Sequence, residues 1–331
     1  LENGTYAVKE TKAPPGYKLD PETHVITING SDTTINVQDD PGRMAIKVVK
    51  KDVETGTTAQ GNASLAGAVY RVSYQLGGQT VTKEITSNAD GTFPMITDIP
   101  FGTVTIQEVT APPGYKLDTE IHTYYIDGSQ MVTDTYELVP DDITEEVQRG
   151  GLTIQKKDSQ TGTTPQGDAS LAGISFEIVN ESQNAVVVGG RTIQPGQVAT
   201  TITTNASGVA TTGANALPYG DYTVRESATN DSMLLTFTEE ISVTIDEDGE
   251  MLEYEAEDDV VRGGITVTKQ DSQTGSTPQG NASFAGIDFE VINRSANPVV
   301  VGGQTYAVGE VVMTITTDES GTASTGNDAL P

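Results

Sequence analysis

Residues 150–190 read GGLTIQKKDSQTGTTPQGDASLAGISFEIVNESQNAVVVGG, and nearly the same sequence returns at residues 263–303, as GGITVTKQDSQTGSTPQGNASFAGIDFEVINRSANPVVVGG. A more diverged copy, IKVVKKDVETGTTAQGNASLAGAVYRVSY, starts at Ile46. Self-similarity over such a long period is the signature of a repeat array, in which each repeat is one structural unit. These three copies therefore decide the domain organisation.

The second half of the repeat also recurs. YAVKETKAPPGYKLD at residues 6–20 returns as VTIQEVTAPPGYKLD at residues 104–118, and YTVRESATND at residues 222–231 occupies the same position in the next copy. The order of these segments predicts two complete repeats, one C-terminal half and one N-terminal part, cut from a longer array whose secretion and anchoring signals lie elsewhere. In chain order they are the head segment (1–42, a C-terminal half), the first repeat (43–147), the second repeat (148–262) and the tail segment (263–331, an N-terminal part).

Each repeat has the pattern of β structure. Apolar and polar residues alternate in ISFEI (174–178) and IDFEV (287–291), which is the period of a strand with one buried face. Asn-Ala-Asp-Gly (88–91) and Asn-Ala-Ser-Gly (205–208) are typical turns, because Asn favours the turn and Gly supplies its left-handed position. Short strands at regular spacing predict an all-β fold of tandem antiparallel β-sandwiches.

Charge and composition exclude several classes of function. The chain has 18 Lys and Arg against 47 Asp and Glu, a net charge of −29 that repels phosphate backbones and anionic lipid headgroups. We therefore expect no nucleic acid and no membrane contact. With no Cys and only two His, thiol catalysis, disulfides and zinc sites lose their usual residues, so we expect no cofactor and no metal site. His24 and His122 are interpreted as surface strand residues.

Two motifs resemble a known family. IKVVKKDVETG (46–56) with SLAGAVYRV (64–72) is similar to the first strand and second-strand entry of the SpaA-like, collagen-adhesin B-type (Cna-B) domains of Gram-positive surface proteins and pilins. YAVKETKAPPGY and VTIQEVTAPPGY resemble that family's E-box. The resemblance covers the whole chain and implies a prealbumin-like β-sandwich. It also implies an intramolecular isopeptide bond that forms spontaneously between a Lys of the first strand and an Asn or Asp of the last, assisted by the E-box Glu.

Carried onto this sequence, the resemblance implies Lys47 as the amine and Glu108 as the E-box glutamate of the first repeat. The acceptor is less defined, because the usual last-strand Asn-Glu-Pro is not intact, and Asp141 or Asp142 is the candidate. In the head segment Glu10 matches the E-box position and Asp39 the acceptor, without a lysine. The alternative is that Lys47 is a solvated strand lysine and that Glu108 merely pairs with a neighbouring charge.

The later repeats depart from this pattern. Thr153 and Thr266 occupy the position of Lys47, and threonine cannot form the bond. Lys156 and Lys269 lie three residues further on, which in a regular strand is the opposite face. We therefore expect a bond in the first repeat and assign none to the second repeat or the tail segment.

The chemistry of such a bond needs no cofactor. A lysine amine attacks only when neutral, and burial in an apolar core disfavours its ammonium form while favouring protonated carboxyl groups. Groups fixed at contact distance by a folded core reach effective molarities of about 10⁵ M or more. A self-formed cross-link is therefore plausible on physical grounds alone.

A repeat array with polar linkers and no further site chemistry favours a structural stalk of a cell-surface adhesin or pilin-like protein, and not an enzyme. Its partners would be neighbouring repeats of the same parent protein and, through a tip domain outside this sequence, a host surface. The resemblance implies an extracellular location, with anchoring to the cell wall through a C-terminal signal outside the sequence. The alternative is a ligand-binding adhesin module that contacts host matrix or glycan, although aromatic residues are 5% and Trp is absent.

Overall fold

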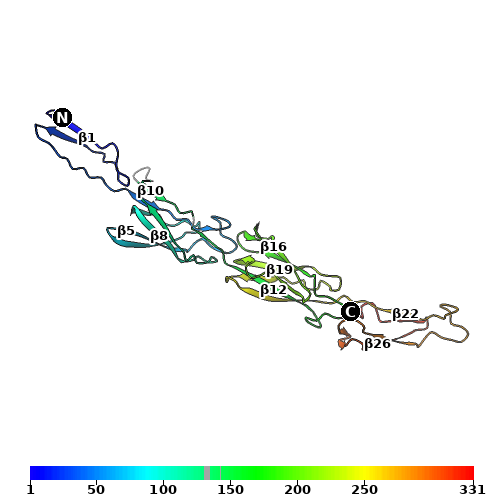
Figure 1. The fold of residues 1–331 in the computed structure, drawn as a ribbon. Coiled ribbons are helices and arrows are strands. Elements are labelled where there is room, and N and C mark those ends of the chain that lie inside the picture. Colours follow the sequence, from blue (N-terminus) through cyan, green and yellow to red (C-terminus); the bar gives the residue numbers. More distant parts are fainter. Residues whose placement is uncertain (130–134, 142) are drawn as a thin grey trace. The chain divides into compact units, whose positions relative to one another are not determined.

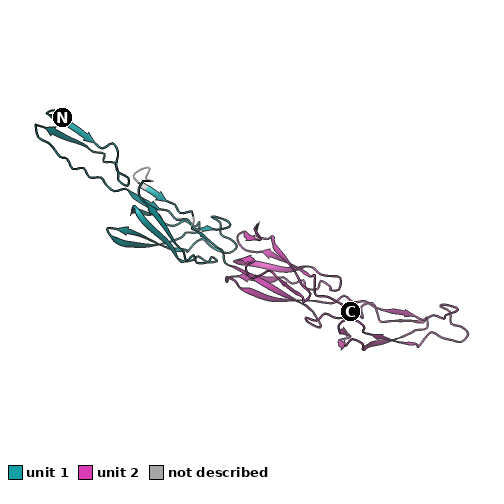
Figure 2. Ribbon diagram, in the orientation of Figure 1, with its two compact units in different colours: residues 1–148 teal, residues 149–331 magenta. Residues whose placement is uncertain are grey.

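The computed structural model describes residues 1–129, 135–141 and 143–331 (Figure 1). Its regular elements in these ranges are strands, and none of the described residues forms a helix that could cross a bilayer. The chain divides into two compact units, residues 1–148 and 149–331 (Figure 2). The predicted all-β fold is confirmed, whereas the finer division into four parts stays a prediction.

The head segment contributes one hairpin-like pair. Strand β1 (Gly4–Lys9) pairs antiparallel with β2 (Thr23–Ile28), and the E-box proline segment lies between them. An isolated bridge joins Tyr17 to Pro41. This bridge brings the end of the head segment back beside the E-box, next to Asp39.

The first repeat is built from two facing sets of strands. One sheet has the order β6-β5-β8-β9, and a second set contains β10-β3-β7 and the short pair β11-β4. The bounds are β3 (Arg43–Ile46), β4 (Lys51–Asp52), β5 (Val69–Leu76), β6 (Gln79–Thr86), β7 (Ile96–Pro100), β8 (Gly102–Thr110), β9 (Ile121–Ile126), β10 (Thr135–Leu138) and β11 (Thr144–Glu145).

The second repeat has the same architecture. One sheet has the order β16-β13-β19-β20, the other has β17-β12-β18 with β21 also paired to β12, and β14-β15 form a separate hairpin. The bounds are β12 (Arg149–Asp158), β13 (Ser175–Asn180), β14 (Val186–Val188), β15 (Arg191–Ile193), β16 (Val198–Thr203), β17 (Val209–Thr211), β18 (Leu217–Pro218), β19 (Gly220–Ala228), β20 (Ile241–Ile245) and β21 (Met251–Asp258).

The tail segment forms three two-stranded pairs, β22-β27, β23-β26 and β24-β25. The bounds are β22 (Thr266–Thr268), β23 (Asp288–Ile292), β24 (Val299–Val301), β25 (Gln304–Tyr306), β26 (Val311–Thr316) and β27 (Thr322–Ser324).

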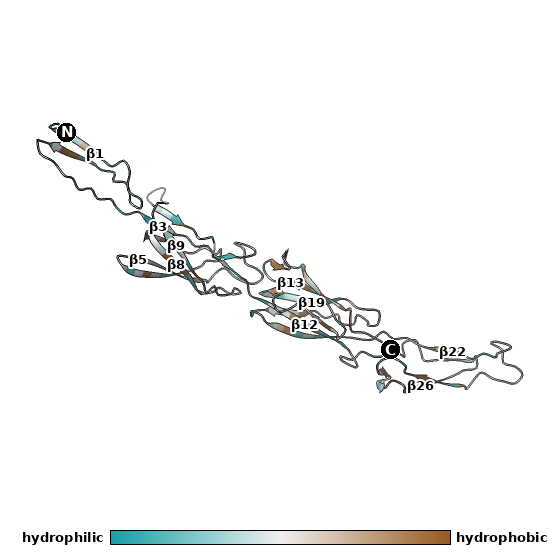
Figure 3. Cartoon of the chain, viewed as in Figure 1, coloured by the Kyte–Doolittle hydropathy of each residue, from teal (hydrophilic) through white to brown (hydrophobic). Residues whose placement is uncertain are grey.

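Both complete repeats bury a core between their sheets. Strands of both units carry hydrophobic and hydrophilic residues in close succession (Figure 3), because alternate side chains point to opposite faces. In the first repeat the core includes Met44, Ile46, Tyr70 and Ile106, and in the second Leu152 and Phe176 are wholly buried. Each strand therefore has one face whose side chains are removed from water.

One pairing differs from the expected antiparallel pattern. The first and last strands of each complete repeat run parallel: β10 and β11 beside β3 and β4 in the first repeat, and β21 beside β12 in the second. In the second repeat this ladder spans eight residue pairs, from Gly151↔Met251 to Asp158↔Asp258. The parallel pairing is what brings the end of each repeat back to its beginning.

A close backbone approach explains a glycine that recurs near the start of two repeats. A Cβ at Gly151 would lie 1.9 Å from the carbonyl oxygen of Gly213, and one at Gly264 would lie 1.8 Å from that of Gly326. We expect Gly151→Ala to destabilise the second repeat by about 1–3 kcal/mol, because the strand must move away from its neighbour. Thermal unfolding of the full chain measures this. The control is Gly263→Ala, where a Cβ meets nothing within 4 Å; an equal effect of both substitutions would contradict the explanation.

Candidate functional site

The first-strand lysine that enters the core is Lys50, and the prediction of Lys47 is corrected. The Lys50 side chain is wholly buried, whereas Lys47 is exposed. Ile46, Val48 and Lys50 are buried alternately with exposed or half-buried neighbours, so Lys50 is in phase with the apolar face and Lys47 is out of phase. Lys47 is therefore the solvated strand lysine that the sequence left open as the alternative.

Lys50 lies between two buried glutamates. Its Nζ is 2.6 Å from Oε1 of Glu108, the E-box residue on β8, and 2.6 Å from Oε1 of Glu145 on β11. The hydroxyl of Tyr70 donates to Glu145 Oε1 at 2.7 Å, and the Tyr70 ring centroid is 5.5 Å from Nζ. Burial raises the pKa of Glu108. We call this group, Lys50 with Glu108, Glu145 and Tyr70, the first cluster.

The acceptor candidates of the first repeat also change. Asp141 is exposed, and Asp142 lies outside the described residues. Glu145 instead faces the lysine, because it alternates in phase with the buried residues Ile143 and Val147. The parallel pairing of Glu145 with Asp52 then sets it beside the strand that carries Lys50.

The second repeat contains an equivalent group, which the sequence comparison did not assign. Lys156 on β12 is wholly buried, with Nζ 2.6 Å from Oε2 of Glu226 on β19 and 2.9 Å from Oδ2 of Asp258 on β21. The backbone amides of Lys50 and Lys156 bond to the carbonyls of Gly91 and Gly208, so the two lysines occupy the same position in their repeats. Lys156, Glu226 and Asp258 form the second cluster.

The two carboxyl groups of the second cluster share their environment. Asp258 Oδ1 accepts from the backbone amides of Thr236 and Phe237 at 3.0 and 2.8 Å. Glu226 Oε1 and Asp258 Oδ2 are buried without a hydrogen-bond partner other than the charge of Lys156. Burial raises the pKa of Glu226 to about 7, against the lowering effect of Lys156, and Asp258 raises it further. A proton held by this pair satisfies the two orphaned oxygens.

The head segment shows the carboxyl half of the same arrangement. Burial and then the charge of Glu10 raise the pKa of Asp39, as expected for two facing carboxyl groups. Glu10 Oε2 accepts from the amide of Asp20 at 2.7 Å, as Glu108 Oε2 does from Asp118 at 2.9 Å. The predicted match of Glu10 and Asp39 to the helper and acceptor positions therefore has the expected geometry, without a lysine between them.

Each histidine pairs with an aspartate. His122 Nε2 is 2.8 Å from Asp118 Oδ2, and His24 repeats this contact with Asp20 at 2.7 Å. Both histidines are half-buried, which corrects their interpretation as surface residues. With Glu120 and Glu22 they form two trios whose ligand atoms lie within 4.8 Å of one another, a separation that a metal ion could bridge.

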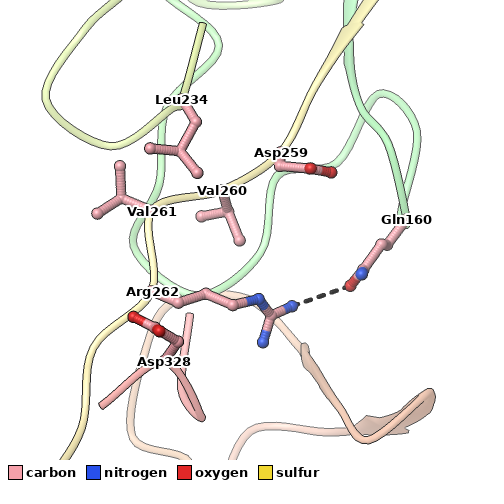
Figure 4. Close-up of a pocket in the computed structure, with 7 residues that line it drawn as sticks. All are labelled: Gln160, Leu234, Asp259, Val260, Val261, Arg262 and Asp328. Carbon is pink, nitrogen blue, oxygen red and sulfur yellow. Dashed lines mark hydrogen bonds between the residues drawn. The ribbon is translucent and has the colours of Figure 1, made fainter. Parts of the chain in front are cut away.

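A cavity of about 290 Å³ lies within the C-terminal unit, where the tail segment meets the second repeat (Figure 4). Arg262 crosses it and donates to Gln160 Oε1 at 3.0 Å and to the carbonyl of Val300 at 3.1 Å. Its charged group is thus committed to contacts between consecutive repeats. The lining residues are Gln160, Leu234, Asp259, Val260, Val261, Arg262 and Asp328.

Known proteins were compared with this chain at the levels of sequence family and fold. The family model "SpaA: Prealbumin-like fold domain" matches residues 1–41, 45–138 and 150–260. No curated protein sequence matches. The chain belongs to the SpaA family of prealbumin-like fold domains. The resemblance inferred from the two motifs is thereby confirmed.

Solved structures show the same fold. The Bacillus anthracis TIE protein is 22% identical with a TM-score of 0.52, and the match covers 91% of this chain and 46% of that one. The C-terminal fragment of the pilus adhesin SpaC from Lactobacillus rhamnosus GG is 17% identical with a TM-score of 0.36, covering 66% and 98%. The minor pilin of Streptococcus agalactiae is 19% identical with a TM-score of 0.27, covering 70% and 100%. The chain thus spans about half the length of the TIE protein.

Proposed function

We propose that this chain is a structural stalk region in which both complete repeats are closed by a self-formed isopeptide bond, Lys50–Glu145 in the first and Lys156–Asp258 in the second. The observation that carries the proposal is the pair of buried clusters, each with a lysine amine within 3 Å of two carboxyl groups. Burying an ion pair is costly compared with packing apolar side chains. Two clusters at the same position are better explained by a reaction than by stability.

The reaction is a condensation within the core. The neutral lysine amine attacks the protonated acceptor carboxyl, and the E-box glutamate takes the proton from the amine and returns it to the departing hydroxyl. One amide forms and one water leaves. Glu108 and Glu226 suit this role because burial raises the pKa of each, so that either can hold a proton near neutral pH. Enforced proximity supplies the driving geometry, so the reaction needs no cofactor.

A stalk follows from the repeats and their chemistry. Tandem sandwiches with covalently closed ends extend a binding domain without unfolding, and the family contains pilin and adhesin subunits in its solved relatives. We therefore propose an extracellular, cell-wall-linked protein whose partners are neighbouring repeats and, through a tip domain, a host surface. A ligand-binding adhesin module is the alternative; it gains no support from the cavity that Arg262 crosses.

Intact-mass spectrometry of the purified full chain tests the bonds. We expect a mass two waters below the sequence mass, because each condensation removes one water. Lys50→Ala and Lys156→Ala should each restore one water, and the double substitution both.

Lys47→Ala is the matched control and should leave both waters missing, because Lys47 is exposed. A wild-type mass equal to the sequence mass would refute both bonds. A deficit that Lys47→Ala removes would instead reinstate Lys47 as the amine.

A further inference from the structure

The two clusters differ in how the acceptor carboxyl is held. In the second cluster Asp258 Oδ1 accepts two backbone amides, from Thr236 and Phe237. In the first repeat the amide of Asp118, which corresponds to Thr236, donates to the helper Glu108 and not to the acceptor. The acceptor is also a different residue, because glutamate replaces aspartate and its carboxyl group lies one methylene further from the backbone.

A tyrosine hydroxyl meets that longer side chain. Tyr70 Oη donates to Glu145 Oε1 at 2.7 Å, and Lys50 Nζ lies 3.5 Å from the same hydroxyl. The corresponding position of the second repeat is Phe176, since Tyr70 pairs with Glu108 and Phe176 with Glu226 in the same register. The repeat with a glutamate acceptor therefore has a hydroxyl at this position, and the repeat with an aspartate acceptor has none.

The first cluster also contains an ambiguity that the second lacks. Glu108 and Glu145 are chemically identical, both are buried, and each has a carboxyl oxygen 2.6 Å from Lys50 Nζ. Distance alone does not decide which of them becomes the amide. A donor that contacts only one of the two acceptors does decide it, because it stabilises the oxyanion that forms when that carboxyl is attacked.

We propose that Tyr70 is a catalytic residue of the first repeat, which selects Glu145 over Glu108 as the acceptor and stabilises the oxyanion at Glu145 Oε1. This inference rests on the proposed function. Lys50 Nζ bonds to Glu145 Cδ, the hydroxyl of Tyr70 hydrogen-bonds to Oε1, and Glu108 moves the amine proton to Oε2, which leaves as water. Tyr70 keeps its own proton throughout, since burial and the neighbouring charge of Glu145 raise its pKa.

The rate of bond formation tests the donor. The full chain is made by cell-free synthesis, quenched at intervals in acidic denaturant and digested, so that peptides containing Lys50 and Lys156 report each repeat separately. Removal of a single oxyanion donor slows catalysis about a hundredfold or more. Tyr70→Phe should therefore slow the first bond about a hundredfold and leave the second unchanged. An unchanged first rate, with the wild-type bond present, overturns the inference and leaves the proposed function standing.

Two glutamine variants test the selection and do not depend on how Tyr70→Phe folds. Gln in the acceptor position releases ammonia on condensation, whereas Gln in the helper position cannot carry the proton. Glu145→Gln should therefore give a first repeat lighter by one ammonia, and Glu108→Gln a first repeat of unchanged mass. Loss of ammonia from Glu108→Gln would overturn the assignment of Glu145. A wild-type chain with no missing water would refute the proposed function itself.

Discussion

Pulled between its two ends, the wild-type chain should show no unfolding event for either complete repeat. The proposed bonds join the first strand of each repeat to its last, at Lys50 and Glu145 and at Lys156 and Asp258. Tension then passes through the amide, and the residues between the bonded side chains carry no load. The parallel pairing of β12 with β21 places both bonded residues on neighbouring strands, so the covalent path is short.

Removing one lysine should expose one repeat to force. Single-molecule extension of Lys156→Ala should add one event that releases roughly 350 Å of chain, because about 100 residues extend by ~3.5 Å each. Lys50→Ala should add a similar event and the double substitution two. Lys47→Ala, which leaves both clusters intact, should behave as the wild type. Two events of this length in the wild type would show that the repeats are not closed.

The fold was predictable because its signals are local. Alternation in ISFEI and the glycine turns depend on near neighbours, and both occur in the structure as strand β13 and as left-handed Gly91 and Gly208. The parallel ladder between β12 and β21 was not predicted, since it joins residues about a hundred positions apart and neither strand carries a local mark of its partner.

The position of the amine could have been found from the same alternation. Met44, Ile46 and Val48 are apolar at every second residue, and Lys50 continues that series, whereas Lys47 interrupts it. Motif alignment placed the lysine by its distance from a second lysine, but the face of a strand is decided by parity. Parity also removes the apparent obstacle in the second repeat, where Lys156 follows Leu152 and Ile154 in phase.

The acceptor was harder to predict because its identity changes between repeats. Glu145 and Asp258 hold one position, and Asp39 holds it in the head segment, but only the aspartates match the residue type that the family resemblance implies. Glu145 becomes recognisable through the structure, by its contacts with Lys50 and Tyr70. The compensating tyrosine lies on another strand, so no spacing in the sequence connects the two.

Substituting the helper of the second cluster should have a large effect on stability. Glu226→Ala removes the residue that moves the proton, so the Lys156–Asp258 bond should not form and one water should return to the mass. It also leaves Lys156 and Asp258 wholly buried in a cluster with one partner missing. Breaking a buried ion group in this way costs about 3–5 kcal/mol, and the lost cross-link adds the entropy of an open loop.

The control for this substitution lies on the same two strands. Glu177 on β13 pairs with Arg225 on β19 at 2.9 Å, and both side chains are partly exposed, so Glu177→Ala removes a carboxylate at a cost of about 0–1 kcal/mol. Calorimetric unfolding of the full chain should therefore show a transition of the second repeat that is strongly lowered by Glu226→Ala and nearly unmoved by Glu177→Ala. Equal shifts would mean that Glu226 acts as an ordinary strand-pair charge. A lowered transition with the water still missing would mean that the bond forms without it, and the helper role would then be wrong.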